Sequence, residues 1–174
     1  MKAKDGLSWF FSRPDELTQE TMEQIALLVA AGGAVSSQWV RSNLARAFLI
    51  GYVTDREALV ACAALKEPRA EFTAMIEEQT GLDLSGCLER GYASVLPACR
   101  GRGLGSGLLA GLTARIGERR FYSVIGEDNA GGRKIALNNN SRRVAVYQSP
   151  LSGKKFAVWM PRRAASENRG GCKP

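Results

Sequence analysis

The sequence predicts a single α/β domain, in which helices pack on a β-sheet. Short apolar runs of strand length alternate along the chain with segments whose apolar residues recur at helical spacing. Residues 89–112 join one such strand to one such helix through a glycine-rich turn. The length of 174 residues suits one domain with a sizeable hydrophobic core.

The first part of the chain predicts a strand followed by two helices. Leu7–Phe11 is apolar and aromatic, as strands often are. Apolar residues within Met22–Val29 then lie on one helical face, and Gly32-Gly33 ends that helix. Ser36-Ser37 can cap a second helix, which carries apolar residues within Trp39–Ala47.

A hairpin and a short helix come next. Phe48–Val53 and Ala58–Leu65 are strand-like runs joined by a polar turn, which predicts an antiparallel pair. Lys66–Gly81 contains a short amphipathic helix that ends at Gly81. This helix either shapes a substrate pocket or only covers an edge of the sheet.

The central segment is predicted to bind a phosphate group. Arg90–Leu96 predicts a strand, and Arg100–Gly105 (RGRGLG) predicts a glycine-rich turn. From Leu104, leucines recur at helical spacing, and the helix is expected to reach Gly117. Backbone N–H groups of such a turn, together with the partial positive charge of a helix N-terminus, suit a phosphate or pyrophosphate. A turn that only caps the helix is the alternative.

The last part of the chain predicts a strand, a short helix and a closing hairpin. Phe121–Ile125 is the strand, and Arg133–Leu137 is long enough for a short helix. Val144–Tyr147 and Phe156–Met160 flank a turn that contains proline and glycine, so they predict a hairpin. The polar, glycine-rich residues 162–174 are expected to be a disordered basic tail.

The central turn resembles a known signature. Arg100 to Gly105 fits the R/Q-x-x-G-x-G/A pattern of the GNAT superfamily, the GCN-related N-acyltransferases, and Val95-x-Pro97 precedes it at that family's usual offset. A nucleotide P-loop would need Gly-Lys-Ser/Thr, which does not occur, and a dinucleotide loop would need a third glycine where Ser106 stands. The sequence therefore resembles the GNAT superfamily over roughly residues 7–161.

The resemblance implies a fold and a donor. The fold would be one GNAT-like domain in residues 1–161, with a mixed, mostly antiparallel sheet, helices on both faces, and a fourth and fifth strand that splay apart. The donor would be acetyl-CoA or another acyl-CoA, with its pantetheine arm between the splayed strands. The residues expected to bind it are Val95, Arg100, Gly101, Arg102, Gly103, Leu104, Gly105, Ser106 and Asn129. Asn129 could instead be a plain helix cap.

The resemblance also implies direct transfer of the acyl group to an amine in a ternary complex. A backbone N–H near Val95, at a bulge in the fourth strand, would polarise the thioester carbonyl. Glu89 is the candidate general base, because burial would raise its basicity toward neutral pH. Its alternative role is to pair with Arg90 or another cation. The family's usual tyrosine acid is missing from residues 136–138. The substitutes for it are Tyr147, Tyr92 and Ser141, and a structural role is the alternative for each.

Composition excludes several classes of site. The chain has no histidine, and its four cysteines form no C-x-x-C pair, so a zinc site or a Ser-His-Asp triad is not expected. No metal is predicted. No apolar run is long enough to span a membrane and no signal peptide is recognised, so a cytoplasmic protein is predicted.

Charge leaves the acceptor open. Residues 1–114 carry 11 Lys/Arg and 13 Asp/Glu, whereas residues 115–174 carry 13 and 4, a net charge of +9. A small-molecule or protein amine is the first expectation for the acceptor. The basic second half favours nucleic acid as an alternative acceptor. A non-catalytic CoA sensor and a basic interaction module are the remaining alternatives.

Overall fold

The computed structural model describes residues 6–32 and 37–162, and each absence stated below refers to these residues. The strands are β1 (Leu7–Ser12), β2 (Ala47–Asp55), β3 (Ala58–Lys66), β4 (Leu88–Val95), β5 (Phe121–Gly126), β6 (Ser141–Gln148) and β7 (Lys155–Pro161). The α-helices are α1 (Gln19–Ala31), α2 (Val40–Ala45), α3 (Ala70–Thr80), α4 (Leu104–Thr113) and α5 (Ala130–Asn138).

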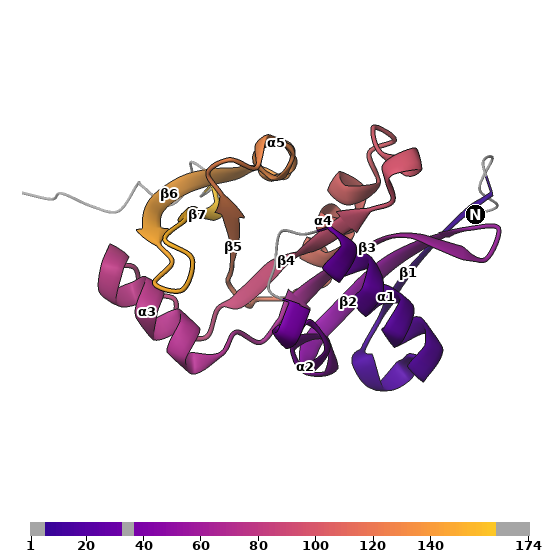
Figure 1. The fold of residues 1–174 in the computed structure, drawn as a ribbon, viewed down its shortest axis with the longest axis horizontal. Helices are drawn as coiled ribbons and strands as arrows, with labels where there is room; N and C mark the ends of the chain where they lie inside the picture. The colour runs from indigo at the N-terminus through magenta and orange to yellow at the C-terminus, as the bar shows by residue number, and fades with distance from the viewer. Residues whose placement is uncertain (1–5, 33–36, 163–174) are drawn as a thin grey trace, which may run out of the picture.

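All seven strands form one sheet in the order β1-β2-β3-β4-β5-β7-β6. Neighbouring strands are antiparallel except for β4 and β5, which are parallel. That pair is joined only at Leu88–Phe121 and Glu89–Tyr122, after which the strands diverge (Figure 1). The mixed, mostly antiparallel sheet and its splayed central pair are therefore confirmed.

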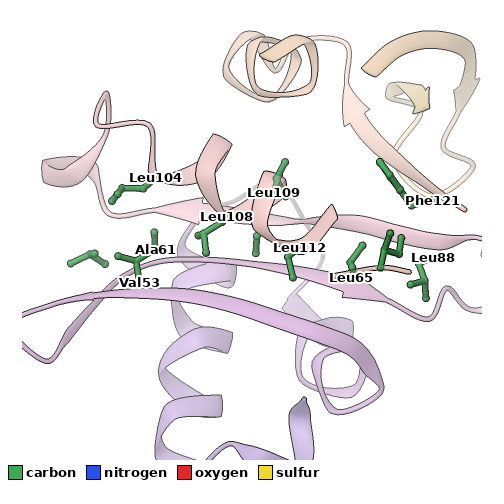
Figure 2. Packing of buried hydrophobic residues seen from close by; sticks show 12 residues of the cluster. Val53, Ala61, Leu65, Leu88, Leu104, Leu108, Leu109, Leu112 and Phe121 are labelled. Carbon is green, nitrogen blue, oxygen red and sulfur yellow. The ribbon is translucent and has the colours of Figure 1, made fainter. Parts of the chain in front are cut away.

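Helices cover both faces of the half of the sheet that contains β2, β3 and β4. Helices α1 and α2 pack on one face, where Ile25 and Leu44 are buried against Ile50. Helix α4 packs on the other face, where Leu104, Leu108 and Leu112 share one buried cluster with Val53, Ala61 and Leu65. In Figure 2, Leu108 and Leu112 point from the helix toward the strands. The leucine spacing thus predicts the buried side of α4 correctly.

The other half of the sheet, β5-β7-β6, also has a helix on each face. The buried Ile76 of α3 packs with Tyr122 and Tyr147 on one face. Ala136 of α5 packs with Trp159 on the opposite face. The predicted short helix in 66–81 therefore covers this part of the sheet, and it also lines a shallow surface hollow beside Arg119.

Element boundaries differ from the sequence expectation at two helices. Helix α4 ends at Thr113 rather than Gly117, although Ile116 beyond its end is still buried in the core. Helix α2 begins at Val40, after a 3-10 turn at Ser37–Trp39, and Ser36 lies outside the described residues. Gly81 ends α3 as predicted, with a positive φ of 69°. Residues 163–174 of the predicted tail are also outside the description.

No helix among the described residues has the length and apolar character that a membrane crossing requires. The same residues contain no group of three or more His, Cys, Asp or Glu side chains arranged to hold a metal ion.

Candidate functional site

The glycine-rich turn presents free backbone N–H groups at the start of α4. Gly101 and Gly103 have φ values of 78° and 77°, and Gly103 is the N-cap of this ten-residue helix. The first helical hydrogen bond runs from Gly107 N to Gly103 O, at 2.9 Å. The N–H groups of Leu104, Gly105 and Ser106 therefore have no acceptor within the helix. This arrangement suits an anion.

The two arginines of the turn are held by neighbouring groups. The Nε of Arg100 donates to the carbonyl of Val95 at 3.2 Å, which ties the turn to the end of β4. The guanidinium of Arg102 lies 3.5 Å from the carboxylate of Asp55, and the Arg102 side chain is 39% exposed. Arg102 is thus free to exchange this weak surface pair for a phosphate.

The bulge in β4 lies earlier than the sequence expectation. Ala64 pairs with Gly91 and Cys62 pairs with Ser94, so Tyr92 and Ala93 together oppose a single residue of β3. Tyr92 has a φ of 56°. Its hydroxyl accepts a hydrogen bond of 2.8 Å from Asn43 of α2. The expectation of a bulge near Val95 is corrected by two to three residues, because the extra residue is accommodated where the Tyr92 side chain enters the core beneath α1 and α2.

Solved structures with a similar fold are known, whereas no protein-family model and no curated protein matches the sequence. A GNAT-family acetyltransferase from Bacillus cereus matches with a TM-score of 0.60 at 13% identity, over 90% of this chain and 99% of that one. The ribosomal-protein-S18-alanine N-acetyltransferase from Escherichia coli matches with a TM-score of 0.63 at 15% identity, over 92% and 98%. Arabidopsis thaliana NAA60, solved in complex with a bisubstrate analogue, matches with a TM-score of 0.63 at 13% identity, over 87% of this chain and 96% of that one.

The chain has the GNAT fold. In this chain, the splayed strands, the bulge in β4 and the glycine turn lie at the positions given above. The similarity to the three solved structures is thus one of fold, since their sequence identity to this chain is 13–15%.

The α1–α2 face of this GNAT fold brings Glu89 into a buried ion pair. Its Oε1 lies 2.8 Å from the Nζ of Lys66, and the two side chains are 13% and 6% exposed. The Lys66 ammonium also lies 3.9 Å from the centre of the Tyr92 ring. Glu89 therefore pairs with a cation, as the alternative expected, but the cation is Lys66 and not Arg90. A carboxylate at the base of the splay can accept a proton.

Tyr147 lies on the same face and is buried. Its ring stacks on Phe156 at 5.7 Å between centres and meets Phe72 edge-on at 6.3 Å. Burial, and then the charge of Glu89, raise the pKa of the Tyr147 phenol above its ordinary value. Tyr147 packs in one cluster with Tyr122, the β5 partner of Glu89, so the two candidate residues share a face of the sheet. A phenol with a raised pKa is, however, a weaker proton donor.

Asn129 takes the helix-cap role that the sequence left open. Its side-chain oxygen accepts a hydrogen bond of 2.8 Å from the backbone N–H of Gly132, at the start of α5. Contact between Asn129 and a donor arm stays a prediction.

Arg90 lies next to Glu89 in β4, and the sequence does not identify it as a candidate site residue. It is 1% exposed and lies on the α4 face of β4, opposite Glu89. Its guanidinium donates to the hydroxyls of Thr113 at 2.8 Å, Ser141 at 3.0 Å and Ser123 at 3.5 Å. Burial lowers the Arg90 pKa to about 10. The sequence gives one indication of this arrangement: side chains alternate along a strand, so Glu89 and Arg90 must lie on opposite faces of β4.

Part of the positive charge in the basic second half, residues 115–174, is neutralised by ion pairs. Arg119 lies 2.6 Å from Glu67, Arg143 lies 2.6 Å from Glu127, and Arg120 lies 3.5 Å from Asp83. These arginines carry less free charge than the sequence count suggests. Binding of nucleic acid stays a prediction.

Proposed function

We propose that this protein transfers an acyl group, most simply acetyl, from acyl-CoA to an amine. The observation that carries the proposal is the set of three unpaired N–H groups at the start of α4. They follow the turn that Arg100 ties to the end of β4 at Val95, beyond the last pair that joins β4 to β5. An anion-binding helix start beside a wedge of free strand edges suits a donor with a pyrophosphate and a long amide-containing arm. The bulge at Tyr92 frees further backbone groups along that wedge.

The donor supplies an activated acyl group, and the residues of this chain would bind it and move a proton. Gly101, Gly103 and the N–H groups that follow them would hold the pyrophosphate, with Arg102 adding charge. Glu89 would take the proton from the acceptor amine as the new C–N bond forms. The C–S bond breaks in the same reaction, and its electron pair leaves on sulfur.

The acceptor is proposed as a primary amine of a small molecule or a protein. The E. coli neighbour is named for an alanine of ribosomal protein S18, which is a protein amine. Nucleic acid is tested separately. Retention on a DNA or RNA column that falls steeply with salt would support it, and no retention at low salt would count against it.

A matched pair of glycine variants tests donor binding. Gly103 and Gly117 have φ values of 77° and 67°, and an added side chain at either would meet nothing within 4 Å. Glu therefore strains both positions to a similar degree. Only Gly103→Glu places a carboxylate beside the free N–H groups of α4. We expect calorimetry to show micromolar acetyl-CoA binding for the wild type and Gly117→Glu, and none for Gly103→Glu. Equal binding by both variants would remove the turn from the site.

A second experiment separates an enzyme from a CoA sensor. Glu89→Gln alone would leave the buried Lys66 ammonium without its partner, so Lys66→Met/Glu89→Gln is the matched variant. We expect both variants to bind acetyl-CoA, and both to lose at least about 100-fold in transfer to a panel of amines, the range for a lost general base. Donor binding by the wild type without transfer to any acceptor would favour the sensor.

A further inference from the structure

Arg90 is a buried cation that has no anionic partner. Its polar contacts are three neutral hydroxyls, and its guanidinium lies 4.3 Å from the centre of the Phe121 ring. Among the described residues, no carboxylate lies within ion-pair distance of it. A buried guanidinium normally has a carboxylate beside it, because an unpaired charge is costly to remove from water. Arg90 therefore provides positive potential that the protein itself does not neutralise.

This charge lies at the narrow end of the wedge. The last pair that joins β4 to β5 is Glu89–Tyr122, and Arg90 and Ser123 are the next residue on each strand. The guanidinium bridges the two strands through its contact with Ser123. It also reaches Thr113 in the last turn of α4, whose partial negative charge helps to hold the cation there.

The length of the donor brings its sulfur to this place. About a dozen bonds separate the pyrophosphate of CoA from its sulfur, the backbone length of roughly four residues, or about 14 Å when extended. The pyrophosphate would lie at the start of α4, on the turn that Arg100 ties to the end of β4 at Val95. Because the bulge uses two residues for one step of the strand, about 14 Å back along β4 reaches the region of Gly91 and Arg90. Gly91 directly follows Arg90 in the strand.

We propose that the Arg90 guanidinium stabilises the thiolate of CoA when the acyl group is transferred. This inference rests on the proposed function. The electron pair of the broken C–S bond remains on sulfur, and the positive potential of the buried Arg90 guanidinium lowers the energy of that charge. Arg90 would thus compensate for the missing tyrosine acid by charge rather than by giving up a proton. Arg90 need not touch the sulfur for this, since its positive charge acts on the thiolate across a distance.

The test compares the binding of CoA with that of desulfo-CoA, which has no thiol, at pH 7.0 and pH 9.5. A thiol with a pKa of about 8.5 is mostly neutral at the first pH and mostly ionised at the second. For the wild type, we expect the preference for CoA over desulfo-CoA to rise about tenfold between the two pH values. Effects of pH that act equally on the two ligands cancel in this ratio, and most Arg90 guanidinium groups are still charged at pH 9.5, because the pKa of Arg90 is about 10.

Arg90→Met has a side chain of similar volume but no charge. The preference of this variant for CoA over desulfo-CoA should therefore not change with pH. Ser141→Ala removes one hydrogen bond of Arg90 but keeps the charge, and it should retain the rise. Arg90→Gln replaces the Met variant if that one does not fold. A wild-type ratio that does not change with pH, or an unchanged rise in the Arg90 variants, would overturn the inference while leaving donor binding intact. Failure of the wild type to bind both ligands would instead overturn the proposed function.

Discussion

Lys66 and Glu89 stand directly opposite each other on β3 and β4, and their charged groups form a nearly buried ion pair of 2.8 Å. Each charge depends on the other, because both side chains are largely removed from water. The pair joins the edge of the splay to the strand beside it. It therefore fixes where the Glu89 carboxylate lies.

Lys66→Met should be strongly destabilising at neutral pH. It leaves the Glu89 carboxylate buried without a partner, and breaking a buried pair in this way costs about 3–5 kcal/mol. Lys66→Met/Glu89→Gln should recover most of that loss, since no charge remains. Urea unfolding of the two single variants and the double variant gives the coupling energy. Losses in the single variants that simply add in the double variant would mean that the pair contributes nothing.

The sequence predicts the glycine turn well, because its pattern is local and each residue has its role within the turn. Lys66 and Arg90 could not be predicted in the same way. Lys66 is 23 residues from Glu89, and Ser141 is 51 residues from Arg90, so both contacts depend on the register and order of the strands. The bulge was misplaced because nothing in the sequence marks a positive φ at a residue as bulky as Tyr92.

Gly111→Ala should destabilise the protein by about 1–3 kcal/mol through overpacking. A Cβ atom at Gly111 of α4 would overlap the Phe11 ring of β1. That ring cannot easily move, because the Arg115 guanidinium covers it at 4.0 Å. Thermal unfolding should show a lower Tm for this variant.

The control for Gly111→Ala is the same substitution in another helix. A Cβ at Gly131 of α5 meets its nearest neighbour at an ordinary 3.7 Å. Gly131→Ala should therefore raise stability by about 0.5–1 kcal/mol, as alanine does in a helix with room for it. Phe11→Leu should relieve part of the loss in Gly111→Ala. Equal Tm changes for both alanine variants would contradict the packing explanation.

Tyr147→Phe should keep acetyl transfer within about threefold of the wild type, well short of the loss expected for a general acid. Its raised pKa makes the phenol a poor donor to a thiolate whose own pKa is about 8.5. The ring contacts with Phe72 and Phe156 survive the substitution. This expectation is tested by measuring the acetyl-transfer rates of the wild type and of Tyr147→Phe from pH 6 to pH 9. A loss of about 100-fold would instead identify Tyr147 as the proton donor.

Folding stability should fall as pH rises above about 9, and Cys62 should account for part of the fall. Burial raises the Cys62 pKa from 9.0 to about 12. The unfolded chain then releases the thiol proton at a lower pH than the folded chain, so the unfolded state binds fewer protons and gains stability as pH rises. Between pH 8 and pH 10, Cys62 alone should lower the free energy of unfolding by about 1.5 kcal/mol. Burial raises the pKa of Tyr122 and Tyr147 as well, and these phenols add to the fall in stability at still higher pH.

The change is measured by urea unfolding in reducing buffer at pH 8 and pH 10, with Cys62→Ala as the control. The alanine variant should be less stable than the wild type at both pH values, but its free energy of unfolding should fall by less from pH 8 to pH 10. Equal falls in the two proteins would exclude Cys62 as the cause.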